Sequence, residues 1–523
     1  MATESSLVNR LVTLVFVLLL QLPLSAGDAV SLSVDFDSIT PGRLLGHLSF
    51  LASDELEGRD TAERGGELAA LYIATHFQSL GLRPGTGPSN GEVEGYFQPF
   101  DLDADVYEDV VLEMDGKTFE LGEDFALFGF TGSGSVDSEL VFCGYGITAP
   151  EFDYDDYAGV DVSGKVVLLL RHEPREKESD KEFFGGSAHT RHAFFVTKFE
   201  NALKHGAAGM ILINDPVHCG EQRHFGIGGE RGIRGLHPAA GRSEAEETKA
   251  GAAIFAGKSI SEFIEQRVDL SGLQTKIDDT KAPSSSSTGV SVSVRLRRSS
   301  EVPNVANVAA ILPGSDPVLK DEYIILGGHF DHEGVQGGEI MNGANDNASG
   351  TTGLLAIAEA FALQPTAPRR SVLFIAFNAE EKGLLGSRYY VEHPLVSLSQ
   401  TAAMLNMDMI GRSTKDTVNL SGGALCSVLD SVSRSALKRV GITEPSFGDT
   451  NINARSDHYP FFARGVPILV FYSDDFADYH TPQDTLDKLT LEQMHRIVHS
   501  IALTAWGVAN VTERPLLKNT RRF

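Results

Sequence analysis

The sequence predicts an α/β protein whose main domain has a mixed, largely parallel sheet with helices on both faces. From about residue 300, short apolar runs alternate with helical segments, a rhythm typical of parallel strands joined by helices. Acidic and imidazole side chains directly follow several of these apolar runs. Because the carboxyl ends of neighbouring parallel strands meet at one crevice, we expect these side chains to converge there.

The elements of this main domain follow from apolar runs and helical periodicity. Four runs predict strands, namely 323–326, 371–377, 402–406 and 467–472. Three further segments predict helices, namely 350–363, 383–391 and 491–508.

The preceding part of the chain changes character twice. Residues 38–100 predict a helical segment, because leucines recur there at helical spacing, and residues 101–135 alternate polar and apolar side chains as strands do. From Glu139 on, apolar runs around one helix (195–205) predict a small β-rich domain. The composition of Ser284–Ser287 predicts a linker, after which 290–297 alternates as a strand leading back to the main domain.

The composition limits the class of protein. A chain of 523 residues exceeds one ordinary domain, so two or three domains are expected. A formal net charge of −27 argues against nucleic-acid partners and fits a soluble protein. The three cysteines, Cys143, Cys219 and Cys426, exclude a disulfide scaffold and lack the paired spacing of a thiolate metal site.

The N-terminus predicts a secretory signal over residues 1–26. Arg10 precedes an apolar run over 11–24, and small residues suited to cleavage follow at Ser25 and Ala26. The run is short for a membrane span, so no stable span is expected after cleavage, with an uncleaved anchor as the alternative. We therefore expect an exported protein, periplasmic or extracellular; the sequence carries no signal for its oligomeric state.

Several candidate ligands lie where strands end or helices begin. His329 and Asp331 are two residues apart just past a strand, so both project to one side, and Asp331 is placed to accept the second ring N–H of His329. By the same alternation His332 is predicted to point away. Asp346 opens a helix, where it is either an N-cap or a carboxylate that bridges two cations.

Two adjacent acids, Glu380 and Glu381, follow the most hydrophobic strand. At a buried strand end they repel each other unless cations compensate, and since neighbours point in opposed directions, one can bind metal while the other faces water. Asp408 follows another strand and His480 lies in a later loop. Together these side chains predict a two-metal hydrolase site, whose mixed nitrogen and oxygen ligands suit zinc and leave manganese and cobalt as alternatives.

The segments that carry these residues resemble the M28 family of zinc-dependent exopeptidases. They read Gly-Gly-His329-Phe-Asp331, Asn-Gly-Ala-Asn-Asp346, Phe-Asn-Ala-Glu380-Glu381, Leu-Asn-Met-Asp408 and Asp478-Tyr479-His480, and residues 51–59 are also typical of the family. The resemblance implies the zinc exopeptidase fold and two Zn²⁺ ions per chain.

The resemblance also implies a role for each residue of the site. Asp346 bridges both ions, His329 and Asp408 hold one, and Glu381 and His480 hold the other. Glu380 is the general base and Asp331 orients His329. Tyr479 resembles a position that hydrogen-bonds the tetrahedral oxyanion. Asp457 and His458 support the ligands, and the peptide bond between Asp346 and Asn347 is cis.

A second resemblance concerns the β-rich region. Gly144-Tyr-Gly146, Ser163-Gly-Lys-Val166 and Gly206-Ala-Ala-Gly209 resemble the protease-associated (PA) domain that is inserted into exported peptidases. The expected organisation is a signal peptide (1–26), the first part of the peptidase domain (27–135), a PA-like insert (136–290), the catalytic domain (291–512) and a basic tail (513–523).

The predicted function is that of an aminopeptidase acting on peptides with a free N-terminus. A metal-bridging hydroxide attacks the scissile carbonyl, and Glu380 takes the proton and passes it to the leaving amine. A carboxypeptidase or dipeptidase of the same fold is an alternative, which needs a cationic clamp for which Arg455 and Arg412 are the near candidates. A glutaminyl cyclase is a further alternative. A peptidase-like receptor is disfavoured, because every ligand position is present.

Overall fold

The computed structural model describes residues 34–87, 92–175, 183–184, 190–217, 236–238, 251–336, 338–413, 417–442, 445–447, 452 and 454–518. The predicted signal peptide, Cys219 and the end of the predicted basic tail lie outside these residues. Within them, no helix has both the length and the apolarity needed to cross a bilayer. Cys143 and Cys426 are free and buried.

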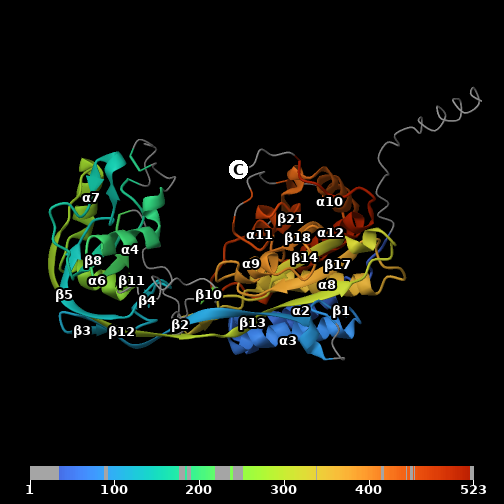
Figure 1. Cartoon of the computed structure of the whole chain (residues 1–523), viewed down its shortest axis with the longest axis horizontal. Coiled ribbons are helices and arrows are strands. Elements are labelled where there is room, and N and C mark those ends of the chain that lie inside the picture. The colour runs from blue at the N-terminus through green and yellow to red at the C-terminus, as the bar shows by residue number, and fades with distance from the viewer. Residues whose placement is uncertain are drawn as a thin grey trace, which may run out of the picture. The chain divides into compact units, whose positions relative to one another are not determined.

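The main domain is built on a mixed sheet (Figure 1). Its strands are β1 (Arg83–Pro84), the first part of β2 (Phe97–Met114), β13 (Asn304–Leu312), β14 (Tyr323–His329), β17 (Ser371–Phe377), β18 (Thr401–Met407), β19 (Asn419–Ser421), β20 (Ser446–Phe447) and β21 (Ile468–Tyr472). β14 pairs in parallel with β17 and β18, and β18 pairs in parallel with β21. β13 is antiparallel to β17, and β19 is antiparallel to β21. The mixed, largely parallel sheet predicted from the sequence is thus confirmed.

Helices cover both faces of this sheet. They are α2 (Pro41–Leu51), α3 (Arg64–Ser79), α8 (Gly350–Ala362), α9 (Leu385–Glu392), α10 (Ser427–Arg439), α11 (His458–Ala463) and α12 (Leu491–Asn510). Tyr390 of α9 and Phe461 of α11 pack against Ile325 of β14 in one buried cluster. Because strand side chains alternate, Ile324 and Leu326 point to the opposite face, where α8 and α12 contact β14.

A second sheet forms the β-rich region. It contains the rest of β2 with β3 (Lys117–Phe119), β4 (Phe125–Leu127), β5 (Gly134–Phe142), β8 (Val166–Leu170), β9 (Gly209–Ile213), β10 (Leu236–Pro238), β11 (Ala252–Ala256) and β12 (Ser286–Glu301). The strands β5, β8, β9 and β11 pair in parallel in that order. Its helices are α4 (Phe195–Lys204), α6 (Lys258–Glu265) and α7 (Leu270–Thr280).

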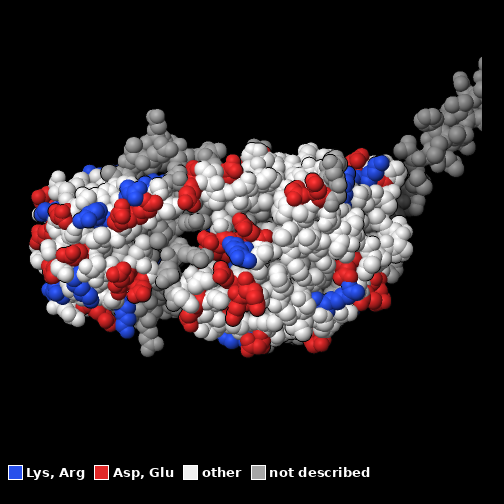
Figure 2. Space-filling model, turned by 90° about the horizontal axis from the view of Figure 1, so that it is seen from below, with Lys and Arg blue, Asp and Glu red and all other residues white. Residues whose placement is uncertain are grey.

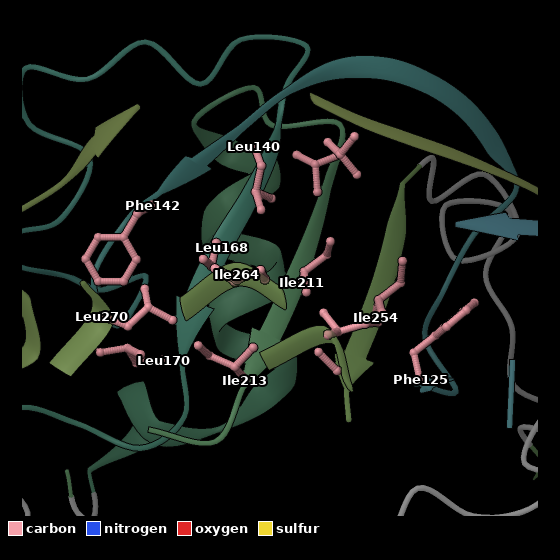
Figure 3. Packing of buried hydrophobic residues seen from close by; sticks show 14 of the residues in the cluster. Phe125, Leu140, Phe142, Leu168, Leu170, Ile211, Ile213, Ile254, Ile264 and Leu270 are labelled. Carbon is pink, nitrogen blue, oxygen red and sulfur yellow. The ribbon is translucent and has the colours of Figure 1, made fainter. Parts of the chain in front are cut away.

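Two apolar clusters, one on each face, hold this second sheet together. Figure 3 shows Leu168 and Leu170 of β8 beside Ile211 and Ile213 of β9, with Ile264 of α6 over them. All of these side chains are fully buried. The alternate residues of both strands, such as Leu169 and Leu212, belong to a separate cluster with Phe199 of α4. The sheet is therefore buried on both faces, as the unbroken apolar runs of β8 and β9 require.

One long strand, β2, belongs to both sheets. β2 pairs with β13 through Phe97–Asp101 and with β12 from residue 104 onward. Strand β12 already pairs with β5 at Ser286 and Ser287, so the predicted linker at Ser284–Ser287 is wrong in its second half. The predicted limits of the insert at 136 and 290 lie inside this sheet, whose strands run from β2 to the end of β12 at Glu301.

Smaller elements complete the described fold. Two short hairpins are formed by β6 (Thr148–Ala149) with β7 (Tyr154–Asp155), and by β15 (Val335–Gln336) with β16 (Glu339–Ile340). Helix α2 begins with Pro41 after Thr40, whose side chain accepts a hydrogen bond from the Arg43 amide. Figure 2 shows Asp and Glu side chains outnumbering Lys and Arg on the visible face, in keeping with the net charge of −27.

Candidate metal centre

Adjacent strands deliver the predicted ligands to one edge of the main sheet. His329 is the last residue of β14, Asp408 follows β18, and the Glu380–Glu381 pair follows β17. Asp346 precedes α8, and His480 lies in the loop after β21. Gly328 lets β14 approach β18 closely, because a Cβ there would lie 2.5 Å from the Met407 carbonyl oxygen. The carboxyl ends of these parallel strands therefore share one crevice.

Asp346 lies between two imidazoles. His329 Nε2 is 3.4 Å from Asp346 Oδ1 and 3.5 Å from Asp408 Oδ1. His480 Nε2 is 3.2 Å from Asp346 Oδ2 and 3.2 Å from Glu381 Oε2. Each oxygen of one carboxylate thus faces a different histidine, and a further carboxylate completes each group. This is the arrangement that a bridging ligand between two cations requires.

Some of the candidate ligand atoms lack a hydrogen-bond partner and would be satisfied by a divalent cation. Asp346 Oδ2 and His480 Nε2 are both buried, and neither makes a hydrogen bond to any described residue. Buried polar atoms without a partner are costly, whereas metal coordination satisfies them. Imidazole nitrogens with carboxylate oxygens are ligands that zinc accepts, so the residues present fit the predicted metal.

The pKa values of the site reflect the number of carboxylates gathered there. Burial opposes protonation of His480, but the carboxylates of Asp346 and Glu381 outweigh it and raise its pKa to about 10. Burial raises the pKa of Glu380 well above its usual range, and Glu381, Asp457 and Asp408 add to this effect. These carboxylates therefore repel one another, as expected of ligands arranged for cations.

Asp331 holds the Glu380–Glu381 turn. Its carboxylate accepts hydrogen bonds from the backbone amides of Glu380 (3.1 Å) and Glu381 (3.2 Å) and from Thr61 Oγ1 (3.2 Å). His329 Nδ1 lies 3.1 Å from the main-chain oxygen of Asp331 and 3.8 Å from its carboxylate. The nearer partner of the ring is thus the backbone of Asp331, and the carboxylate fixes the two glutamates instead.

His332 lies within the site, and the prediction that it points away is wrong. Its side chain is fully buried, and Nδ1 lies 2.9 Å from Glu381 Oε1. The alternation argument fails because β14 ends at His329, so the period of two no longer applies three residues later. His332 contacts the oxygen of Glu381 that does not face His480.

Three further predicted residues lie close to the ligands, namely Tyr479, Asp457 and His458. The Tyr479 ring is stacked on that of His480 with centroids 3.7 Å apart, and its side chain lines the cavity over the site. His458 lines the same cavity. Asp457 is fully buried, and burial raises its pKa to about 7.

Two buried residues that the sequence analysis did not single out hold the ligand loops. The Arg59 guanidinium donates to the carbonyl oxygens of Phe330 (2.8 Å) and Gly343 (3.0 Å), which lie beside His329 and Asp346 in the chain. The Asp484 carboxylate accepts from the amides of Asn345 (2.9 Å) and Asp346 (3.0 Å). Arg59 closes the segment 51–59 that resembles the M28 family, which is the one signal that pointed to it.

A cavity of about 520 Å³ opens over these residues. Part of its wall is apolar or aromatic, formed by Met409, Ile452, Val470, Tyr472, Phe476 and Tyr479. Arg455, Ser421, Ser456 and His458 add polar groups. Arg412 binds Asp475 (2.7 Å) and Asp478 and is not among the lining residues. A cavity of this size and character is typical of small-ligand sites.

Known proteins share this fold. An aminopeptidase from Aneurinibacillus sp. strain AM-1 superposes with a TM-score of 0.61 at 21% identity, over 93% of this chain and 97% of that one. BSAP, a zinc aminopeptidase from Bacillus subtilis, superposes with a TM-score of 0.59 at 19% identity, over 89% of this chain and 94% of that one. The fold is therefore that of the zinc aminopeptidases.

Sequence comparison relates two segments of the chain to known families. The model of peptidase family M28 matches residues 307–505, and the PA domain model matches residues 136–252. Aminopeptidase YwaD of Bacillus subtilis (strain 168) is 31% identical, over 33% of this chain and 39% of the relative. Leupeptin-inactivating enzyme 1 of Streptomyces exfoliatus is 32% identical, over 33% of this chain and 36% of the relative. The chain spans less than half the length of these curated relatives. Residues 307–505 are thus similar to peptidase family M28, and residues 136–252 are similar to the PA domain.

Proposed function

We propose that this protein is a dinuclear zinc aminopeptidase. The observation that carries the proposal is the position of Asp346, whose two oxygens face His329 and His480 respectively. His329, Asp346 and Asp408 would hold one ion, and Asp346, Glu381 and His480 the other. When bound, two zinc ions supply acidification of water and polarisation of a carbonyl. The substrates are peptides with a free N-terminus.

In this proposal Glu380 is the general base. Its Oε2 lies 4.0 Å from His329 Nε2, farther than the oxygens of Asp346 (3.4 Å) and Asp408 (3.5 Å), and this greater distance supports a role as base rather than ligand. Its raised pKa, caused first by burial, suits a carboxylate that takes a proton from the attacking water and returns it to the leaving amine. The proposed role of Tyr479 is to donate its hydroxyl to the oxyanion, which its place in the lining of the cavity supports.

The acidity of the site supports an amino-terminal substrate. Four carboxylates line the cavity, namely Asp346, Glu380, Glu381 and Asp408. Three of them are proposed zinc ligands, whose charge the bound ions offset, which leaves Glu380 as the carboxylate that can attract the positive α-ammonium end of a peptide. An aminopeptidase therefore fits this end of the cavity.

The test combines metal analysis with two matched substrates. Purified protein should bind two zinc ions per chain by elemental analysis and should hydrolyse leucine p-nitroanilide. Acetylation of the leucine amine should abolish hydrolysis, and a chelator should inhibit it reversibly. Equal rates on the free and the acetylated substrate, or full activity without bound metal, would contradict the proposal.

A carboxypeptidase is the second candidate, because one cation lines the cavity. Arg455 is a group that could bind a C-terminal carboxylate. A relative named probable glutamate carboxypeptidase AMP1, from Arabidopsis thaliana, is 30% identical over 41% of this chain and 31% of that relative. Release of the C-terminal residue from an N-acetylated dipeptide would favour this candidate over the aminopeptidase.

We also propose export through the signal over residues 1–26. A basic Arg10, a short apolar run and the small residues Ser25 and Ala26 support it. Expression of the full chain should yield a mature protein that begins at residue 27. N-terminal sequencing of the secreted protein tests this, and recovery of an uncleaved, membrane-bound form would contradict it.

A further inference from the structure

Arg455 is an unpaired cation in the wall of the cavity. It is the only Lys or Arg among the described residues that line the cavity, and its side chain is exposed. Within the described parts of the chain, no carboxylate lies within ion-pairing distance of its guanidinium. Arg412, by contrast, is bound to Asp475 and Asp478. The cavity therefore offers one guanidinium for a ligand.

The backbone at Arg455 is anchored to the sheet that carries the metal ligands. The next residue, Ser456, is buried, and its hydroxyl oxygen accepts a hydrogen bond of 2.8 Å from Asn406 Nδ2. Asn406 belongs to β18, and the candidate ligand Asp408 directly follows that strand. After Ser456 and the fully buried Asp457, helix α11 begins at His458. The backbone of Arg455 is thus held beside the site, while its side chain is exposed.

The chemistry of the group defines its ligand. A guanidinium presents its donors in a planar fork that matches the two oxygens of a carboxylate. The other charged groups on the cavity wall are the acids and histidines at the metal end, and Arg455 pairs with none of those acids. A substrate that carries an ammonium group and a carboxylate would find complementary charges at the two ends of the cavity.

We propose that Arg455 binds a carboxylate of the peptide substrate, so that substrates with a carboxylate close to the scissile bond are preferred. The carboxylate is either the C-terminus of a dipeptide or the side chain of an acidic residue at the first or second position. A cavity of about 520 Å³ accommodates a short peptide of this kind. This inference rests on the proposed aminopeptidase function and names its substrate class.

Three pairs of peptides, each differing only in one carboxylate, test the proposal. Leu-Leu against Leu-Leu-amide reports a C-terminal carboxylate. Glu-Leu-amide against Gln-Leu-amide reports an acidic first side chain, and Leu-Glu-amide against Leu-Gln-amide an acidic second one. The kcat/KM of each peptide is measured for the zinc-loaded wild type and for Arg455→Gln, Arg455→Lys and Arg464→Gln.

The expected result is a preference of about tenfold or more for the acid in at least one pair, the size expected of a charge-assisted hydrogen bond. Arg455→Gln should abolish this preference mainly through KM, and Arg455→Lys should keep part of it. Zinc content should be the same in all variants, which separates lost recognition from a damaged metal centre.

Arg464→Gln is the matched control. Arg464 follows α11, pairs with Glu392 at 3.5 Å, and does not line the cavity, so its loss should leave all three ratios unchanged. The inference is overturned if the wild type shows no preference in any pair, whatever the folding of the variants, or if Arg455→Gln keeps the preference. Failure of the wild type to cleave Leu-Leu-amide at all would instead overturn the proposed function, and this inference with it.

Discussion

Glu380 and Glu381 are neighbours in the chain, yet their surroundings give them opposite acidities. Burial raises the pKa of Glu380 well above its usual range. Burial acts on Glu381 in the same direction, but the neighbouring imidazoles of His332 and His480 outweigh it and hold the pKa of Glu381 well below its usual range. A base must exchange a proton and a metal ligand must stay ionised, so the two environments match the two proposed roles.

Replacing Glu380 with Gln tests this division of roles. The variant should keep both zinc ions, because Glu380 is in neither proposed ligand set. Its kcat should fall by about 10²–10⁴-fold, the usual contribution of a general base. The matched variant Glu381→Gln should lose zinc. Elemental analysis and steady-state kinetics of both variants measure the outcome, and loss of zinc from Glu380→Gln would make it a ligand instead.

His332 should strengthen metal binding without being essential for folding. Its Nδ1–H donates to Glu381 Oε1 and so orients the carboxylate whose other oxygen faces His480. Replacement of His332 by Leu should weaken binding of one zinc by about 10–100-fold, as loss of such supporting contacts commonly does. Titration against a competing chelator measures this, and His332→Asn, whose amide can still donate, should restore part of the affinity. Unchanged affinity for both ions in His332→Leu would remove this role.

At the scale of elements, Arg59 links the segment before α3 to the two ligand loops. Its guanidinium donates to carbonyl oxygens of Leu51, Phe330, Asn342 and Gly343 and is almost fully buried. Asp331, Asp346 and Asp484 lie close enough to favour its charged form, although burial lowers its pKa to about 10. One cation therefore links the segment 51–59 to two ligand loops that lie much later in the sequence.

Arg59→Met should destabilise the protein and loosen the site together. The substitution leaves several buried carbonyl oxygens without donors, at a cost of about 1–3 kcal/mol each if they stay dry. Urea unfolding should show a loss of about 3 kcal/mol or more, and zinc affinity should fall because Phe330 and Gly343 adjoin His329 and Asp346. Arg64→Met, at an exposed position that opens α3, is the control. Full zinc affinity in Arg59→Met would show that Arg59 supports the fold alone.

Helices α2 and α3 should respond to acid through His47. This side chain is buried, and its Nδ1 lies 2.9 Å from the Tyr72 hydroxyl. Burial, followed by the charges of His76 and Arg43, lowers its pKa from 6.5 to about 4. Since the folded pKa is depressed, its contribution to stability is present above pH 6.5 and is lost as the pH falls toward 4.

A shift of this size corresponds to about 3 kcal/mol. The free energy of unfolding should therefore decrease between pH 6.5 and pH 4, and the decrease should be smaller in His47→Asn, which cannot titrate. Urea unfolding of both proteins at several pH values measures the difference. Identical pH profiles would show that His47 is not the titrating group.

The sequence predicted some elements better than others, for physical reasons. The strands β14, β17, β18 and β21 are buried on both faces, so their apolar runs were unambiguous. β12 begins in a Ser-rich stretch that resembles a linker, and only its pairing with β5 makes it a strand. Arg59 was missed because its partners are backbone carbonyls, which leave no pattern in the side chains, and His332 because the chain leaves β14 before it.

At the scale of the molecule, the metal ions should stabilise the fold. Without cations, the carboxylates of Asp346, Glu380, Glu381 and Asp408 repel one another inside the crevice. A ligand that binds only the folded state adds about 3–4 kcal/mol when present at 100–1,000 times its Kd. Removal of zinc should therefore lower the Tm by several degrees, and added zinc should restore it.

Differential scanning calorimetry with and without a chelator measures this shift. The variant Glu380→Gln, which keeps the proposed ligands, should show the same shift as the wild type. Asp346→Asn, which removes the bridging carboxylate, should show little. A Tm that does not depend on zinc in the wild type would mean that the site holds no tightly bound ion.

The shared strand β2 and its partner β12 have a consequence for how the insert is joined to the main domain. They pair antiparallel from the second sheet back to Ala104 and Glu301, so the chain leaves and re-enters the main sheet at neighbouring positions. The Cα partners Pro99 and Ala306 lie just beyond, within that sheet. Recombination that removed the intervening codons, or exchanged them for others, could close the gap with a tight hairpin and preserve the pairing of β2 with β13. The insert is therefore joined to the main sheet at a single place, where its two connecting strands lie side by side.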